Sequence, residues 1–129
     1  MLSTNTTMAI YLNLPVYKAS YDLLLKIFRL TKELPREYKY SLGQDLRHTA
    51  TDLIKYIFVA NSTHDKIIAL SECRARVETI RLYLRLLFDL KVIGLDMFVA
   101  TAEINESVSK QLNNWQKYYQ RPELSTVKT

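Results

Sequence analysis

The fold is decided by residues 70–88, which read LSECRARVETIRLYLRLLF. Apolar side chains recur through this stretch at alternating steps of three and four residues, at Leu70, Cys73, Val77, Ile80, Leu84 and Leu87. Because an α-helix turns once in about 3.6 residues, this spacing puts them on one face. The stretch therefore predicts a long helix, from about residue 64 to residue 91, that packs one stripe into a core.

Three further segments show the same spacing, over residues 15–34, 42–60 and 96–118. Pro35, Asn61-Ser62-Thr63 and Gly94 separate the four segments. Their stripe residues are, in chain order, Val16, Ser20, Leu23, Ile27, Leu30 and Leu34; Leu42, Leu46, Thr49, Leu53, Tyr56 and Ala60; and Met97, Thr101, Ile104, Val108, Gln111, Trp115 and Tyr118. Four helices with short connections predict an all-α fold, an antiparallel up-down-up-down four-helix bundle.

Length and composition fit one small domain. The chain has 129 residues, and we expect a flexible lead over residues 1–14, the bundle over 15–121 and a tail over 122–129. Its net charge of +5 permits nucleic-acid binding without requiring it. A single cysteine excludes an internal disulfide, and no stretch approaches the roughly 20 apolar residues of a membrane span. We expect a soluble, cytoplasmic protein with no membrane partner.

The third helix carries a second apolar face. Ala75, Thr79, Leu82 and Leu86 lie roughly opposite its main stripe, where a bundle helix normally shows charges, and Tyr83 lies beside them. An exposed patch of this kind is typical of an interface. We therefore predict a homo-oligomer joined through Leu82, Leu86 and Tyr83. The alternative is a central helix that the other three helices and its own loop cover.

Arg81 and Arg85 are the strongest candidates for function. They stand one helical turn apart among apolar residues, where a guanidinium group is rare unless an anion or another chain meets it. Two such groups about 5–6 Å apart suit successive phosphates. Arg74 shares their edge of the helix, and Arg47 lies in a row with Lys39 and Lys55 on the second helix that could extend a basic strip.

An alternative for these arginines is a solvated helix face with local ion pairs. Glu78 could pair with Arg81 or Arg74, and Asp89 with Arg85. In a related alternative, the arginines pair with acidic residues across subunits or on a partner enzyme, and the protein is an interaction scaffold.

Motifs of catalysis are missing from the sequence. His48 and His64 form no Glu-x-x-His pattern, and there is no glycine-rich phosphate loop or nucleophile elbow. Cys73 falls on the core stripe, which favours a buried small hydrophobe over a nucleophile. We expect a non-enzyme without metal or cofactor. An enzyme with a metal in the bundle core remains a third alternative, which elemental analysis would test.

Five short motifs occur in order along the chain: Leu34-Pro35-Arg36, Leu42-Gly43-Gln44-x-Leu46-Arg47, Val59-Ala60-Asn61, Ile80-Arg81-x-x-Leu84-Arg85-Leu86 and Leu112-x-x-Trp115. Together they resemble the accessory variability determinant of diversity-generating retroelements. That family belongs to a wider group of small four-helix proteins, which includes those encoded in intervening sequences of 23S ribosomal RNA genes. Asn61-Ser62 is closer to the retroelement branch.

The resemblance implies a barrel-like homopentamer with a positively charged surface. It also implies association with a reverse transcriptase and with template RNA or cDNA, in support of mutagenic retrohoming. Arg81 and Arg85 match paired basic residues of the family, and Arg36 and Arg47 match further basic positions. We therefore expect nucleic-acid binding through Arg36, Arg47, Arg74, Arg81 and Arg85. The alternative is an oligomeric interaction scaffold of the intervening-sequence type that does not bind nucleic acid directly.

Overall fold

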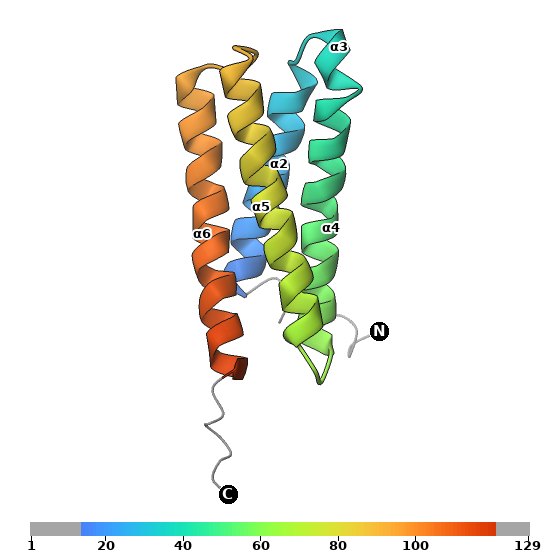
Figure 1. Ribbon diagram of the computed structural model, residues 1–129, viewed down its shortest axis with the longest axis vertical. Helices are drawn as coiled ribbons and strands as arrows, with labels where there is room; N and C mark the ends of the chain where they lie inside the picture. The colour runs from blue at the N-terminus through green and yellow to red at the C-terminus, as the bar shows by residue number, and fades with distance from the viewer. Residues whose placement is uncertain (1–13, 121–129) are drawn as a thin grey trace, which may run out of the picture.

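Figure 1 shows the computed structural model, which describes residues 14–120, with side chains through residue 119. Its helices are α2 (Pro15–Lys32), α3 (Arg36–Lys39), α4 (Leu42–Ser62), α5 (Ile67–Asp89) and α6 (Leu95–Gln120). The described range contains no strand. The predicted all-α four-helix bundle is confirmed, with α3 as an additional single turn in the first connection. The predicted lead, apart from Leu14, and the predicted tail lie outside the described residues.

The four long helices run antiparallel, each beside the next in the chain. α2 packs against α4 and α6, and α5 packs against the same two helices from the other side. α2 and α5 therefore occupy diagonal corners of the bundle, and in Figure 1 α2 lies behind α5. Their outward faces point in opposite directions, which separates two surfaces of the protein.

The predicted stripes of the first and third helices are confirmed. All six stripe residues of α5 are buried, as are Val16, Ser20, Leu23, Ile27 and Leu30 of α2 and Leu34 just after it. Two polar residues of α2 enter this core because their hydroxyls are satisfied within the helix. Ser20 Oγ donates to the carbonyl of Val16 at 2.7 Å, and Thr31 Oγ1 donates to that of Ile27 at 2.7 Å.

The predicted stripes of the second and fourth helices are only partly right. On α6 the buried residues include Asn105 and Leu112, whereas Met97 and Tyr118 are exposed. Asn105 escaped prediction because asparagine usually lies on the surface. Here its Nδ2 donates to the carbonyl of Val77 on α5 at 3.2 Å. Because of this hydrogen bond, burying the amide group costs less free energy than burying it without a partner. On α4, Ala50 and Ile57 are buried, while the predicted Leu42, Thr49 and Tyr56 are half-buried.

α5 ends at Asp89, two residues before the predicted end near residue 91, and Gly94 does not terminate it. Lys91 takes a left-handed conformation with φ of 64°, its amide donates to Phe88 O at 2.9 Å, and the amide of Val92 donates to Leu87 O at 3.0 Å. These two bonds are those of a Schellman motif, in which glycine normally takes the left-handed position. Gly94 instead precedes α6, where its carbonyl accepts the amide of Phe98 at 3.0 Å.

The connection between α4 and α5 is held by a lysine. α4 runs through Ser62, and Lys66 Nζ then donates to the carbonyls of Ala60 at 2.6 Å and Thr63 at 2.8 Å. A cation on the last carbonyls of a helix satisfies acceptors that have no partner within the helix. The same Nζ lies 5.5 Å from the ring centre of Tyr119 on α6. Lys66 thus joins three helices at this end of the bundle.

Gly43 marks a close approach in the first turn of α4. A Cβ at this position would lie 3.1 Å from Leu34 Cδ1 and 3.1 Å from the carbonyl oxygen of Tyr38. Both distances are tighter than ordinary van der Waals contact. The glycine therefore lets α4 approach the chain around α3.

Candidate nucleic-acid interface

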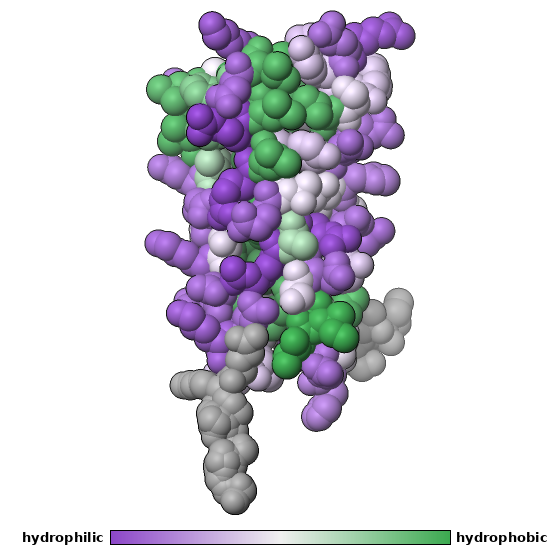
Figure 2. Space-filling model, in the orientation of Figure 1, coloured by the Kyte–Doolittle hydropathy of each residue, from purple (hydrophilic) through white to green (hydrophobic). Residues whose placement is uncertain are grey.

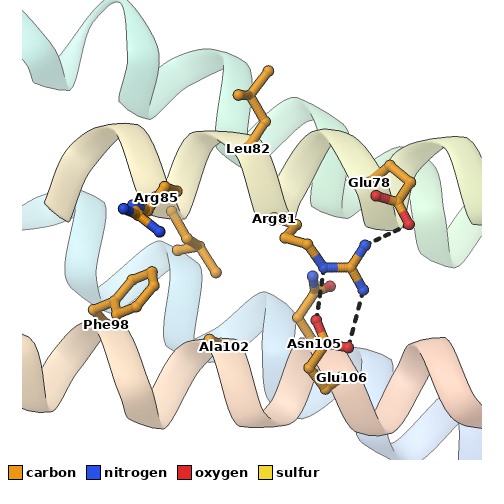
Figure 3. Close-up of a pocket in the computed structure, with 9 residues that line it drawn as sticks. Glu78, Arg81, Leu82, Arg85, Phe98, Ala102, Asn105 and Glu106 are labelled. Atoms are coloured by element: carbon orange, nitrogen blue, oxygen red, sulfur yellow. Dashed lines mark hydrogen bonds and ion pairs between the residues drawn. The ribbon is translucent and has the colours of Figure 1, made fainter. Parts of the chain in front are cut away.

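α5 and α6 border a groove of about 370 Å³ that contains the strongest sequence candidates. Its walls carry Arg81, Arg85, Glu78 and Glu106, with Leu82, Phe98, Ala102 and Asn105 among its other lining residues (Figure 3). The Oδ1 atom of Asn105 is buried and has no hydrogen-bond partner among the described residues. The groove thus combines charged side chains with an apolar floor.

The guanidinium group of Arg81 lies between two carboxylates and pairs with both. Its Nε and Nη2 donate to the carboxylate of Glu106 at 2.7 and 3.0 Å, and Nη1 pairs with Glu78 (Figure 3). The hydrogen bonds to Glu106 and Glu78 raise the pKa of Arg81. In turn, the hydrogen bond from Arg81 lowers the pKa of the Glu78 carboxyl. Arg81, whose side chain is 39% exposed, is therefore a clamp between α5 and α6.

Arg85 lies one turn further along α5 and also has a carboxylate partner. Its Nε donates to Asp89 Oδ1 at 3.0 Å, and its side chain is 67% exposed. Figure 3 shows the guanidinium groups of Arg85 and Arg81 directed away from each other along the groove. The local pairs of the alternative interpretation, Glu78 with Arg81 and Asp89 with Arg85, are thus confirmed. That these arginines bind nucleic acid remains a prediction.

The other three predicted arginines are divided between two faces. Arg74 is near the same groove and donates from Nη1 to Asn113 Oδ1 of α6 at 2.6 Å. Arg47 lies on the far face, where its guanidinium carbon is 5.9 Å from the ring centre of Phe28 on α2. Arg36 is exposed at the first residue of α3. The five arginines therefore form no single strip within one chain.

The predicted apolar patch is partly open. Leu82 is 62% exposed and Leu86 is half-buried, whereas Tyr83 packs partly against the core. Figure 2 shows apolar surface at both ends of α5 with hydrophilic side chains beside it. Besides Leu82, the exposed large apolar residues on or next to α5 are Ile67, Ile68 and Leu90. One flank of the protein thus offers apolar contacts along a single helix.

The described residues bear on two kinds of reactive site, a metal centre and a nucleophilic thiol. Among residues 14–119, no three His, Cys, Asp or Glu side chains gather so that they could hold a metal ion. Cys73 is fully buried, and burial raises the pKa of its thiol to about 12, so the thiol remains protonated at neutral pH. The predicted role of Cys73 as a small core hydrophobe is confirmed. Within residues 14–120, no helix has both the length and the apolar character needed to cross a membrane.

Comparison with known proteins shows which family the chain belongs to. A search of curated proteins finds no match. A family model described as bAvd-like matches residues 15–119, which span all four long helices and the groove between α5 and α6. That match covers most of the chain and agrees with the resemblance carried by the five motifs. The chain belongs to the bAvd-like family, the bacterial accessory variability determinants.

Proposed function

We propose that this protein is a non-catalytic accessory factor of a diversity-generating retroelement, which binds the reverse transcriptase and the template RNA or cDNA. Membership of the bAvd-like family is the observation that carries the proposal, because it suggests an accessory role in such elements. The excess of basic residues, 18 against 13 acidic, favours a polyanionic partner. Binding through a basic surface would hold the template near the polymerase.

Self-association is part of the proposal. The exposed Leu82, with Leu86 beside it, supports an apolar contact between copies on α5. A pentamer is what the family resemblance implies. Repeating a weak basic surface around a ring raises the affinity for a long nucleic acid, because each further contact becomes intramolecular.

An interaction scaffold without direct nucleic-acid binding is the second candidate. The observation that favours it is the pairing of Arg81 with Glu78 and Glu106, since a guanidinium already held by carboxylates attracts phosphate less strongly. On this alternative the protein binds the reverse transcriptase alone, and any template reaches the complex through the enzyme.

A reconstitution experiment separates the two candidates. The full-length protein is mixed with fluorescently labelled template RNA and, separately, with the purified reverse transcriptase of the same element. We expect RNA binding whose affinity falls linearly with salt on a double logarithmic plot, together with a complex with the enzyme. Enzyme binding without RNA binding at low salt would support the scaffold, and failure of both would contradict the accessory role.

A further inference from the structure

Within the part of the chain that the structure describes, the basic residues of α2 lack the carboxylate partners that most arginines of α5 have. Pro15–Lys32 contains one acidic residue, Asp22, and four basic residues: Lys18, Lys26, Arg29 and Lys32. Among the described residues, no carboxylate lies within ion-pair distance of any of these four cations. Lys18, Arg29 and Lys32 are exposed, and at 100° per residue they fall within an arc of about 60°.

The arginines of α5 are largely neutralised by comparison. Arg76, Arg81 and Arg85 each pair with a carboxylate, and Arg74 donates to the amide oxygen of Asn113. The field of an ion pair falls off faster with distance than that of a single charge, so a paired arginine attracts a distant polyanion less. Within the described range, α2 therefore carries more cations without a carboxylate partner than any other helix, and it lies at the diagonal corner from α5.

Exposed aromatic rings lie beside the cations of α2. Tyr21 and Phe28 are each 46% exposed, and both lie on the side of α2 that faces α4. Tyr21 stacks on Tyr17, with ring centres 6.3 Å apart and planes 11° apart, and the guanidinium of Arg47 lies over Phe28. Single-stranded nucleic acids are commonly bound by cations along the backbone and aromatic rings against the bases.

We infer that the outward face of α2 is the main binding surface for single-stranded nucleic acid, with phosphates on Lys18, Arg29 and Lys32 and bases against Tyr21 and Phe28. This α2 face spans about 21 Å from Lys18 to Lys32 at 1.5 Å per residue, which is long enough for several phosphates. The inference rests on the proposed function, and it names the α2 face as the surface that binds the nucleic acid. It leaves the apolar stripe of α5, at the diagonal corner, free for other copies.

Two double variants with equal loss of charge test the inference. Arg29→Ala/Lys32→Ala removes two cations from the α2 face, and Arg81→Ala/Arg85→Ala removes two from α5. Binding of a labelled, unstructured single-stranded RNA is measured by fluorescence polarisation across a salt series. We expect the α2 variant to lose about tenfold or more in affinity at low salt and to lower the salt slope by roughly 1–2, because each phosphate contact on a single strand contributes about 0.7. The α5 variant should change both quantities far less.

Two further variants exclude a general effect on folding or charge. Arg29→Lys/Lys32→Arg keeps both charges and should bind RNA like the wild type. Tyr21→Leu should weaken binding by about fivefold or more with an unchanged salt slope, since stacking on a ring is worth about 1–3 kcal/mol per base. Circular dichroism checks that every variant is helical.

Each outcome separates the inference from the proposed function. Loss of RNA binding in the α5 variant, with normal binding in the α2 variant, would overturn the inference and leave the function intact. An α2 variant that loses only the reverse transcriptase would identify the α2 face as a protein-docking surface, which also overturns the inference. A wild-type protein that fails to bind RNA at low salt would instead contradict the nucleic-acid part of the proposed function.

Discussion

Arg81 of α5 and Glu106 of α6 form a two-pronged ion pair, with Nε donating to Oε2 at 2.7 Å and Nη2 donating to Oε1 at 3.0 Å. This contact joins two helices, whereas the other ion pairs of the described residues join neighbours along one helix. Two parallel hydrogen bonds fix the relative position of the groups better than one. The pair is therefore a contact of defined geometry between α5 and α6 at the groove.

A double-mutant cycle on Arg81→Ala and Glu106→Ala measures this contribution. Both side chains are partly exposed, so solvent screens the pair, and we expect a coupling free energy of about 0.5–1 kcal/mol from urea denaturation. Arg85 and Asp89 serve as the matched control, because they pair within α5 and are more exposed. Their coupling should be at most about 0.5 kcal/mol. Equal coupling in the two cycles would show that the contact between helices stabilises the fold no more than a pair within one helix.

Glu78 should make the stability depend on pH. Arg81 holds the pKa of the Glu78 carboxyl below its ordinary value of 4.5 in the folded protein, so folding favours the charged form. The resulting stabilisation is present above pH 4.5 and is lost as the pH falls through the folded-state pKa. We expect Glu78→Gln to lower the free energy of unfolding at pH 7 and to have a smaller effect as the pH falls through the folded-state pKa of Glu78. Urea denaturation at pH 7 and over an acidic pH series checks this, and an effect that grows on acidification would contradict it.

Lys66 should stabilise the fold more than a residue in a connection between helices usually does. Its Nζ satisfies carbonyls at the end of α4, and Lys66→Met keeps most of the side-chain volume while removing the donor. We expect a loss of about 1–2 kcal/mol in the free energy of unfolding, since hydrogen bonds to charged groups are the stronger ones. Lys55→Met on the exposed face of α4 is the control and should change little. An unchanged denaturation midpoint for Lys66→Met would show that water replaces the ammonium group.

The sequence predicts best those elements whose interactions lie within one helix. Every predicted stripe residue of α2 and α5 is buried, because nearly all of them are apolar and the exception, Ser20, satisfies its hydroxyl within the helix. The ion pairs of Arg81 with Glu78 and of Arg85 with Asp89 were foreseen as an alternative, because residues three or four apart on a helix face each other.

Contacts between helices were not predicted. Glu106 and Asn113 meet Arg81 and Arg74 only because α6 packs on α5 in one register, and no spacing within a helix shows that register. The burial of Asn105 depends on the same packing. For the candidate site, the sequence therefore identified the cations of α5 and, as an alternative, their partners within that helix, but not the partners Glu106 and Asn113 on α6.

The end of α5 offers a stabilising substitution. Lys91 takes a left-handed conformation, with φ of 64°, that costs a residue with a Cβ about 1 kcal/mol relative to glycine. Lys91→Gly should therefore raise the free energy of unfolding by up to about 1 kcal/mol, measured by chemical denaturation. Lys91→Ala removes the same charge while keeping the Cβ, so it should not stabilise. A gain in both variants would instead trace the effect to the lost charge.

Leu82 should decide the oligomeric state. Its side chain is 62% exposed in the single chain, so Leu82→Glu should leave the helical fold intact. In an assembly that buries this residue, the new carboxylate would be desolvated without a partner, which costs several kcal/mol. We therefore expect the wild type to be oligomeric by size-exclusion chromatography with light scattering, and Leu82→Glu to be monomeric.

Val59→Glu is the matched control for Leu82→Glu, because Val59 is an exposed apolar residue on α4 rather than on α5. If the α5 stripe forms the contact, Val59→Glu should keep the mass of the wild-type assembly. If Val59→Glu dissociates the assembly and Leu82→Glu does not, the interface lies on α4 instead of α5. A wild-type protein that stays monomeric at micromolar concentration would show that the prediction of self-association is wrong, and that the apolar surface of α5 is covered by another partner or left open.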